Sequence, residues 1–465
     1  MRADVTGEHF FCRDRDFYKR IFTLMGALIL QNLLSFSVNL ADNIMLGSYS
    51  QTALSGAATV NQIQFFVQMV AVGIGDGLVV LGSQYWGQKR TSPIVSLTGI
   101  ALCFGWVFGL AVTFAVGFFP HQVLSFFTND EAIIAAGTEY LVLMRFTYLL
   151  FITTTILLAM LRSAETVKIA MLLAALALMT NVGLNYTFIF GHFGAPELGI
   201  TGAAIGTITS RILELSVLLF YLCRVDKKLK IRFREMFRPD RRLRESYFRV
   251  CLPVVVTQAL WGLSNPLQTA IIGHLSSDAI AANSAATTLY STLKVIAIAS
   301  ASASGVVIGK AVGSGNAGKI REYARSLQVL YLGIGVLTSI LLLLFRNPVL
   351  SLYSMTPAAM ELAGQIINVL AVTCIGTSYQ MPVLGGIVRG GGDTKFVLYN
   401  DLISIWGIVL PVSFLAAFVW KLPVLTVIIL LNSDQIFKCG AAFIKCNRYH
   451  WIKKLTIDSK QTLGE

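Results

Sequence analysis

Short motifs in the first half of this chain recur in its second half. Residues 39–47 match residues 265–273: both stretches begin with Asn and end with Gly, and they lie 226 residues apart. A second pair, residues 161–168 and 388–395, recurs at nearly the same spacing. A self-similarity at half the chain length predicts two related halves of about 225 residues each.

The composition is too apolar for a soluble protein of this length. Hydrophobic residues make up 55% of the chain and charged residues only 13%, whereas charged residues reach roughly 25% in soluble domains. A helix needs about 20 apolar residues to cross a bilayer. Twelve stretches meet that need: 21–46, 52–82, 94–119, 132–161, 168–190, 200–222, 251–272, 279–309, 326–346, 359–387, 396–419 and 423–445. We therefore expect an all-α membrane protein with six transmembrane helices per half, an organisation typical of transporters that bind substrate between two repeats.

The basic residues predict the orientation of these helices. Most of the 37 Lys and Arg residues fall on one side of the predicted topology, and only Arg346 and Lys421 fall on the other. The positive-inside rule makes the basic side cytoplasmic. We expect a multi-pass protein of the cell inner (plasma) membrane with both termini in the cytoplasm. Six helices per half is an even number, so the halves share one orientation and are related by a pseudo-two-fold axis along the membrane normal.

Three segments follow from this topology. Residues 1–223 are predicted to form an N-terminal six-helix bundle, and residues 250–465 a C-terminal six-helix bundle with a basic tail. The stretch between them, residues 224–249, carries eleven Lys and Arg against four acids. Binding to nucleic acid or to anionic lipid is one interpretation of such a charge run. We favour a cytoplasmic linker whose charge sets the topology, and we expect no nucleic-acid partner.

Motifs of enzymes and metal sites are absent or fail on inspection. Residues 313–319 fit the spacing of a phosphate-binding loop, but Ile320 stands where a Ser or Thr is needed, and a membrane helix precedes the motif. The seven cysteines form no CxxC pair, and no His/Cys cluster appears. We expect neither catalysis nor a cofactor nor a metal site.

Asp42 is the strongest candidate for a functional residue. It is the only charge in its predicted span, and an ionisable side chain within a membrane is costly, which favours a functional role. Asn181 and Asn185 lie one helical turn apart on another predicted helix, at about the same depth as Asp42. A carboxylate facing two carboxamides suits a proton or Na⁺ site. The alternative is a buried Asp that is merely satisfied by a neighbouring amide.

Other ionisable residues in the spans have structural explanations. Two pairs, Arg211 with Glu214 and Asp434 with Lys438, can neutralise each other along one helix face. Three more, Asp76, Asp401 and Lys294, lie toward the cytoplasmic helix ends, where snorkelling or water relieves the cost. We expect Glu139 and Arg145 to find partners on neighbouring helices. The polar residues that we expect to line a substrate cavity are Gln31, Asn39, Gln258, Asn265, Gln268 and Lys294.

Several motifs, in this order along the chain, resemble those of the multidrug and toxic compound extrusion (MATE) transporters. They are residues 42–47 followed by Ala53 and Leu54, then 161–164, 184–191, 197–204 and 389–394. The resemblance implies two six-helix bundles arranged as a V, alternating access, and export of organic cations or drugs in exchange for H⁺ or Na⁺. It also implies a small-molecule substrate, a surrounding lipid bilayer and a monomer.

The resemblance carries the family's helix 1 aspartate onto Asp42. The helix 5 pair, often Asn and Asp, falls on Asn181 and Asn185, so an amide replaces the second carboxylate. The helix 7 carboxylate of NorM-like members falls on Trp261, which favours the branch named for DNA-damage-inducible proteins. Gly26 stands where many members have a proline. A lipid-linked precursor flippase of the same superfamily is the alternative function, but such proteins usually carry several cavity-lining cations, for which only Lys294 and Arg145 are candidates here.

Overall fold

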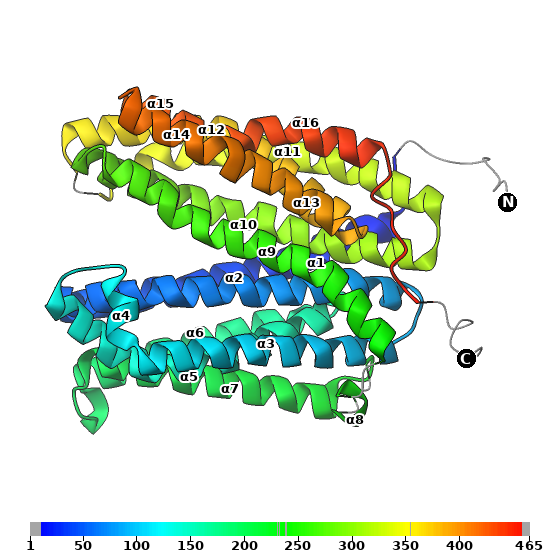
Figure 1. Ribbon diagram of the computed structural model, residues 1–465, viewed down its shortest axis with the longest axis horizontal. Coiled ribbons are helices and arrows are strands. Elements are labelled where there is room, and N and C mark those ends of the chain that lie inside the picture. Colours follow the sequence, from blue (N-terminus) through cyan, green and yellow to red (C-terminus); the bar gives the residue numbers. More distant parts are fainter. Residues whose placement is uncertain (1–10, 230, 232, 238–239, 354, 458–465) are drawn as a thin grey trace. The chain divides into compact units, whose positions relative to one another are not determined.

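The computed structural model describes residues 11–229, 231, 233–237, 240–353 and 355–457, and within them the chain is helical with no β-strand (Figure 1). Twelve helices in the described residues are long and apolar enough to cross a membrane. The predicted fold class and number of spans are thereby confirmed. The ends of the predicted segments at residues 1–10 and 458–465 lie outside the described residues, as do linker positions 230, 232 and 238–239.

The first half contains α1 (Arg15–Tyr49), α2 (Gln51–Gly87), α3 (Ser92–Phe118), α4 (Pro120–Ser125), α5 (Glu131–Ser163), α6 (Lys168–Phe190), the 3-10 turn His192–Gly194 and α7 (Gly199–Phe220), which ends in a π turn, Tyr221–Val225. The second half contains α8 (Phe233–Met236), α9 (Arg241–Gly273), α10 (Ser277–Ser314), α11 (Ala317–Leu350), α12 (Pro357–Pro382, continued by Val383–Val388), α13 (Thr394–Asp401, continued by Leu402–Val409), α14 (Leu410–Phe414, continued by Leu415–Val419), α15 (Val424–Leu431) and α16 (Asp434–Asn447). The α13–α14 run forms one span, Thr394–Val419, and α15–α16 form the last, Val424–Asn447.

Several helices extend well beyond their predicted apolar stretches. The predicted span 21–46 is part of α1, which has 35 residues and is about 52 Å long, against a hydrocarbon core of about 30 Å. Hydropathy detects only the part of a helix that lies in the core, whereas helical hydrogen bonding continues into the aqueous layer. For the same reason α9 begins at Arg241, so the linker predicted at 224–249 is shorter than expected and residues 241–249 are helical.

The described helices pack into two compact units whose bounds differ from the predicted segments. The N-terminal unit comprises Leu30–Gly82 and Arg90–Ala259, and the C-terminal unit comprises Met1–Ile29, Ser83–Lys89 and Leu260–Glu465. Helices α1, α2 and α9 are therefore each divided between units. The sequence cannot indicate this division, because it arises from where each end of a long helix packs.

Contacts inside each unit account for the assignment of these helix ends. In the N-terminal unit, the hydroxyl of Tyr247 near the start of α9 donates to the carbonyl of Ile74 on α2 (3.0 Å). In the C-terminal unit, the ring of Phe17 on α1 stacks on Tyr323 of α11, with ring centroids 4.1 Å apart. The start of α1, from the first half of the chain, thus packs on a helix of the C-terminal unit. The start of α9, from the second half, packs on a helix of the N-terminal unit.

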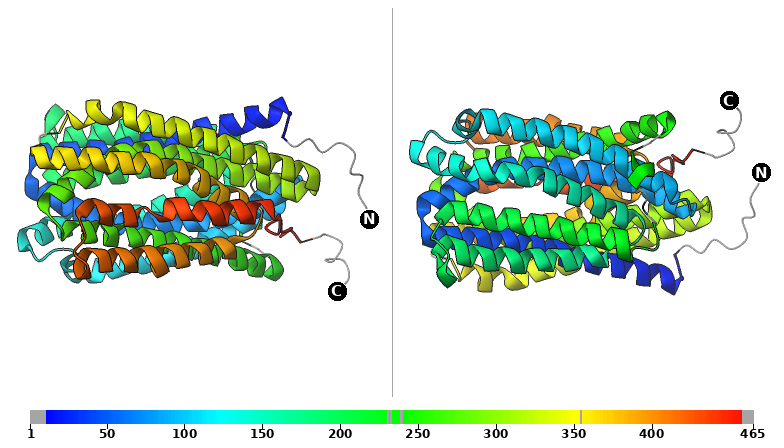
Figure 2. Two further views of the ribbon diagram at one scale, coloured as in Figure 1. Left: turned by 90° about the horizontal axis from the view of Figure 1, so that it is seen from above. Right: turned by 90° about the horizontal axis from the view of Figure 1, so that it is seen from below.

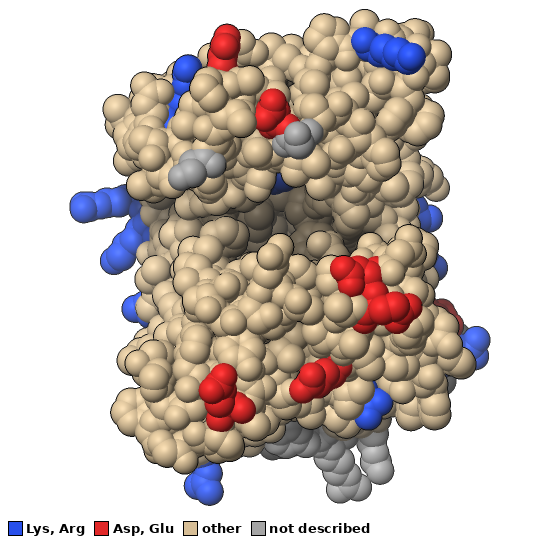
Figure 3. All heavy atoms as spheres, turned by 90° about the vertical axis from the view of Figure 1, so that its left-hand side faces the viewer, with Lys and Arg blue, Asp and Glu red and all other residues tan. Residues whose placement is uncertain are grey.

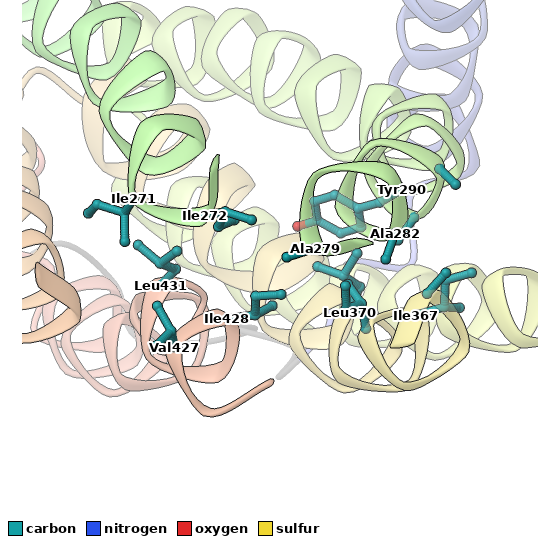
Figure 4. Close-up of a cluster of buried hydrophobic side chains, with 14 of the residues drawn as sticks. Ile271, Ile272, Ala279, Ala282, Tyr290, Ile367, Leu370, Val427, Ile428 and Leu431 are labelled. Atoms are coloured by element: carbon teal, nitrogen blue, oxygen red, sulfur yellow. The ribbon is translucent and has the colours of Figure 1, made fainter. Parts of the chain in front are cut away.

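Helices of each unit run alongside one another (Figure 2). In the N-terminal unit, α5 contacts α3 and α7, and α6 packs along α7. In the C-terminal unit, α12 packs along α10 and α11 and also contacts α16. An apolar cluster fills this unit between α9, α10, α12 and α15, with Tyr290, Leu370 and Ile428 among its buried members (Figure 4).

Residues 448–457, which we call the C-terminal strap, are anchored within the C-terminal unit. Trp451 is fully buried and its indole N–H donates to the carbonyl of Cys446 (2.7 Å). The indole lies so close to Gly391 that a Cβ there would clash with it. The side chain of Gln84, near the end of α2, donates to the carbonyl of Lys453 (3.1 Å) and accepts from the backbone N–H of Leu455 (2.9 Å). The backbone of the strap therefore holds the end of α2 through hydrogen bonds to the Gln84 side chain.

Asp393, in the turn before α13, is the charged centre of this anchor. Its two carboxylate oxygens pair with Lys453 of the strap (2.9 Å) and Lys445 of α16 (2.8 Å). Burial by itself raises the pKa of the Asp393 carboxyl, but hydrogen bonds and charge from Lys445 and Lys453 outweigh it and hold the pKa below its usual range. A carboxyl whose pKa is lowered by folding stabilises the fold above its unfolded-state pKa, about 3.9, and loses that contribution as the pH falls through the folded-state value.

We predict that Asp393→Asn destabilises the protein by roughly 1–3 kcal/mol, because it removes charge-assisted hydrogen bonds to two lysines. Thermal unfolding in detergent should show a lower Tm for the variant by a few degrees. The difference from the parent should stay constant between about pH 8 and pH 5 and shrink below about pH 4, where the Asp393 carboxylate becomes protonated. Glu361→Gln, at an exposed position, is the control and should leave Tm unchanged. A Tm difference that disappears already at about pH 6 would contradict the lowered pKa.

Candidate functional site

The structure brings Asp42 and the two predicted asparagines together in the N-terminal unit. Asp42 lies near the end of α1, and Asn181 and Asn185 lie one turn apart on α6, both fully buried. The Nδ2 of Asn185 donates to Oδ1 of Asp42 at 2.5 Å and also contacts Oδ1 of Asn181 at 3.3 Å. The structure therefore brings together the three side chains that the sequence predicts at a similar depth.

The amide of Asn185 has one unused acceptor. Among the described residues its Oδ1 is buried without a hydrogen-bond partner, which is an uncommon and costly state for a polar atom. The atom is adjacent to α7, where a Cβ at Gly206 would clash with it. Glycine at this position leaves just enough room for the carboxamide beside the helix backbone.

Helix α7 completes the polar cluster. Asn181 donates through Nδ2 to the Oγ1 of Thr207 (3.2 Å), and both side chains are buried. Tyr140 of α5, also buried, lies close enough to interact with Asp42 and Thr207. Sequence reasoning missed Gly206, Thr207 and Tyr140, because uncharged residues are common in membrane helices. For Gly206 and Thr207 the one signal in the sequence is that they lie two and three residues after the family motif at 197–204.

The cluster provides oxygen atoms and one ionisable group. The carboxylate of Asp42 and the carboxamide oxygens of Asn181 and Asn185 are ligands suited to a hard cation, and the carboxylate is also a site for a proton. No group of three or more His, Cys, Asp and Glu side chains that could hold a metal occurs in the described part of the chain. The oxygen atoms of this cluster suit a hard cation or a proton.

A family model described as MatE matches residues 27–187 and 253–415, together more than half of the chain. This chain belongs to the MatE family. The two matched ranges fall one in each repeated half, as the internal duplication predicts. Known homologues in the family are transporters rather than enzymes, which confirms that expectation from the sequence.

Proteins of similar sequence align with most of the length of this MATE chain. This chain is 25% identical over 438 residues to the "Probable multidrug resistance protein NorM" of Thermotoga maritima, and the alignment covers 93% of each chain. It is 24% identical over 404 residues to the "Uncharacterized transporter YisQ" of Bacillus subtilis, covering 85% of this chain and 86% of that protein. A crystal structure of the Vibrio cholerae MATE transporter VcmN has a TM-score of 0.85 at 17% identity, covering 95% of this chain and 98% of that one. That likeness shows a shared fold.

Several ionisable residues elsewhere in the spans of this MATE protein have a charged, hydrogen-bonding or aromatic partner. The two predicted same-helix pairs are present, Arg211 with Glu214 at 2.7 Å and Asp434 with Lys438 at 3.1 Å. Glu139 accepts a hydrogen bond from Thr201 on α7, as expected for a partner on a neighbouring helix. Arg145 has its guanidinium over the ring of Phe146, 5.0 Å from the centroid.

Three predictions of solvated or snorkelling charges were wrong. Asp76 pairs with Arg162 of α5 at 2.8 Å, and Asp401 pairs with Lys438 at 2.9 Å. Lys294 has its ammonium over the ring of Trp261, 5.1 Å from the centroid. For Asp76 and Asp401 the partner lies on a different helix, whereas Lys294 also lies over Tyr290, four residues earlier on α10, 5.7 Å from the ring centroid.

The predicted substrate-contacting residues fall in different units. Gln31, Asn39 and Gln258 belong to the N-terminal unit, whereas Asn265, Gln268 and Lys294 belong to the C-terminal unit. Among the described residues, the five amide side chains in this set make no hydrogen bond. All are half-buried except Asn39, which is exposed. Their polar groups are therefore available for a ligand.

We predict that Gly206→Ala disturbs the Asp42 cluster of this MATE protein. The added methyl group must displace the Asn185 amide, and overpacking of this kind costs typically about 1–3 kcal/mol. We expect a lower Tm in detergent and reduced dye efflux from vesicles. Gly183→Ala on α6 is the matched control, because a Cβ there meets nothing within 4 Å. Equal behaviour of the two variants would contradict the tight packing of Asn185.

Proposed function

We propose that this chain is a secondary antiporter that exports organic cations or drugs in exchange for an ion, with Asp42, Asn181 and Asn185 as the coupling site. The observation that carries the proposal is the 2.5 Å hydrogen bond from Asn185 to Asp42. It joins Asp42, whose carboxylate forms no ion pair among the described residues, to the buried amide of Asn185, which in turn contacts that of Asn181. The NorM relatives are named as probable multidrug resistance proteins, which supports multidrug substrates.

Protonation of Asp42 would change the direction of this hydrogen bond. The ionised carboxylate accepts from Asn185, whereas a protonated carboxyl must donate its own hydrogen. The unpartnered Oδ1 of Asn185 provides the acceptor if the amide turns over. The cluster thus has two hydrogen-bonded arrangements, one for each state of Asp42, and an ion that favours one arrangement shifts the population of the conformation in which it fits.

We propose H⁺ rather than Na⁺ as the coupling ion. Asn185 presents an N–H, not an oxygen, to the carboxylate, and a donor at that position competes with a bound metal cation. Na⁺ is a hard cation that needs several oxygen ligands, as Ca²⁺ and Mg²⁺ do. The cluster contains a single carboxylate, because an amide stands where many family members have the second one.

The orientation, branch and assembly are part of the same proposal. The linker and the strap are both rich in Lys and Arg, which supports a cytoplasmic location for these segments and for both termini in the cell membrane. The opposite face shows Asp and Glu side chains, with Lys and Arg mainly at its margins (Figure 3). Trp261 at the position of the NorM-like carboxylate favours the DNA-damage-inducible branch. We propose a monomer in which the six polar residues named above contact the substrate.

We predict that Asp42→Asn abolishes coupling, because the amide keeps the shape of the side chain and cannot take up a proton. The variant should express and unfold like the parent. In everted vesicles, efflux of a dye cation driven by an imposed pH gradient should fall to the level of vesicles without the protein. Full efflux by Asp42→Asn would rule out the coupling assignment.

We predict that Asn185→Asp changes the ion dependence of transport. A second carboxylate adds negative charge and two oxygen ligands beside Asp42, which favours a bound cation. Efflux should become stimulated by an imposed Na⁺ gradient, or its pH optimum should shift. Asn347→Asp, at an exposed position on α11, adds the same charge away from the cluster and should leave both profiles unchanged. Unchanged profiles for Asn185→Asp would remove α6 from the ion site.

A further inference from the structure

A basic pocket lies in the C-terminal unit where the last span ends. Its volume is about 250 Å³, and it is lined by Phe396 of α13, by Ala441, Ile444 and Lys445 of α16, and by Arg448 and His450 of the strap. One contributing span begins at Thr394 and the other ends at Asn447. The pocket therefore lies at the ends of two spanning helices, at the depth of the lipid headgroups.

The backbone of the strap fixes one wall of this pocket. Tyr449 has a left-handed backbone conformation, with a φ of 56°, which is unfavourable for a residue with a side chain. The strap then passes the start of α13 (Figure 1), where the backbone N–H of Lys453 donates to the carbonyl of Gly391 (2.9 Å). The buried Trp451 anchors this turn. The fold thus holds the backbone on either side of Tyr449, and with it the two strap residues of the pocket.

Positive charge and unused hydrogen-bond donors meet at this pocket. The guanidinium of Arg448 is exposed and makes neither a hydrogen bond nor an ion pair among the described residues. Lys445 pairs with Asp393 at 2.8 Å and lies over the ring of Phe396, 4.4 Å from the centroid. The other oxygen of Asp393 is taken by Lys453 at 2.9 Å. One carboxylate therefore faces three cations, and the charge of Arg448 is not balanced.

An apolar stripe on α16 leads to this guanidinium. Phe437, Gly440, Ile444 and Arg448 follow one another at intervals of three or four residues, which places them along one helix face. Arg448 keeps helical backbone angles just beyond the end of α16. Phe437 is 41% exposed and Ile444 is 52% exposed, and a Cβ at Gly440 would meet nothing within 4 Å. The glycine thus leaves open space between two exposed apolar side chains, in line with Arg448.

We propose that this pocket binds the headgroup of an anionic phospholipid, with an acyl chain lying along Phe437, Gly440 and Ile444. Arg448 and Lys445 donate charge-assisted hydrogen bonds to the phosphate. The unbalanced positive charge favours an anionic lipid over a zwitterionic one. Basic pockets between membrane helices at the headgroup level are suited to acidic lipids. The site lies outside the proposed coupling cluster and substrate contacts, and it goes beyond the proposed function.

Lipid binding to the purified, delipidated protein tests the pocket. The probes are phosphatidylglycerol and phosphatidylcholine with identical acyl chains, added in detergent, and native mass spectrometry measures the lipid bound. The parent protein should bind phosphatidylglycerol more tightly. Arg448→Gln should weaken its binding about ten-fold or more, the usual range for a lost hydrogen bond to a charged group. Arg448→Lys, which keeps the charge, should weaken it less. Arg224→Gln, at an exposed position where the span Gly199–Val225 ends, is the matched control and should bind like the parent.

A second variant tests the path of the acyl chain. Gly440→Leu fills the open space on α16 and should weaken binding of phosphatidylglycerol while leaving the charge of the pocket unchanged. Gly333→Leu on α11 is its control, because a Cβ there also meets nothing within 4 Å, and it should bind like the parent. Glycerol phosphate has the headgroup chemistry without the acyl chains. It should displace the lipid only at a large excess.

Three results would overturn the proposal. The first is equal binding of the two lipids by the parent protein. The second is equal binding of phosphatidylglycerol by Arg448→Gln and Arg224→Gln. The third is displacement of the lipid by an equal concentration of glycerol phosphate, which would indicate a site for a free phosphate instead. If Arg448→Gln does not fold, the lipid preference of the parent and the comparison of Gly440→Leu with Gly333→Leu still decide the matter.

Discussion

No water is available inside a bilayer to replace a missing hydrogen bond, so each polar group in the spans of this protein must find its partner within the chain. Helices meet that requirement for the backbone, and the described spans are all helical. The side chains follow the same constraint: Asp76 pairs with Arg162, and Lys438 lies between two aspartates. Against this background the groups left incompletely satisfied are informative. Oδ1 of Asn185 and the ammonium of Lys294 are two such groups, one in each compact unit.

The sequence predicts those parts of the structure that depend on local composition. The twelve apolar stretches of the sequence correspond to the twelve spans. Asp42 and Asn185, which are predicted at a similar depth in the membrane, are hydrogen-bonded to each other. Features that depend on packing between distant helices were missed. Arg162 is 86 residues from Asp76, and no periodicity links them. Gly206 matters because an amide presses against it, which only a three-dimensional arrangement reveals. The division of α1, α2 and α9 between units has the same origin.

The two repeated halves share a fold and differ in the chemistry of their interiors. When the repeats at 39–47 and 265–273 are aligned, Asn39 matches Asn265, while Asp42 matches Gln268. The second copy thus has an uncharged amide where the first has its isolated carboxylate. The C-terminal unit instead contains two carboxylates, Asp401 and Asp434, that share the ammonium of Lys438, and Asp434 also acts on the charge of Lys294. Duplication supplies two scaffolds, and substitution at a few interior positions gives them different binding properties.

Under the proposed function, this difference bears on how ion and substrate are coupled. Asp42 belongs to the N-terminal unit, whereas Asn265, Gln268 and Lys294, three of the residues proposed to contact the substrate, belong to the C-terminal unit, so competition for Asp42 does not couple a proton to a substrate held by those three. Each ligand can influence the other only by favouring one conformation of the transporter over another. Coupling then requires that each site differ in affinity between the conformations, and the Asn185 amide offers a specific source of such a difference. The two hydrogen-bonded arrangements of the amide require different amounts of space beside Gly206. The packing of α6 on α7 is therefore linked to the protonation of Asp42.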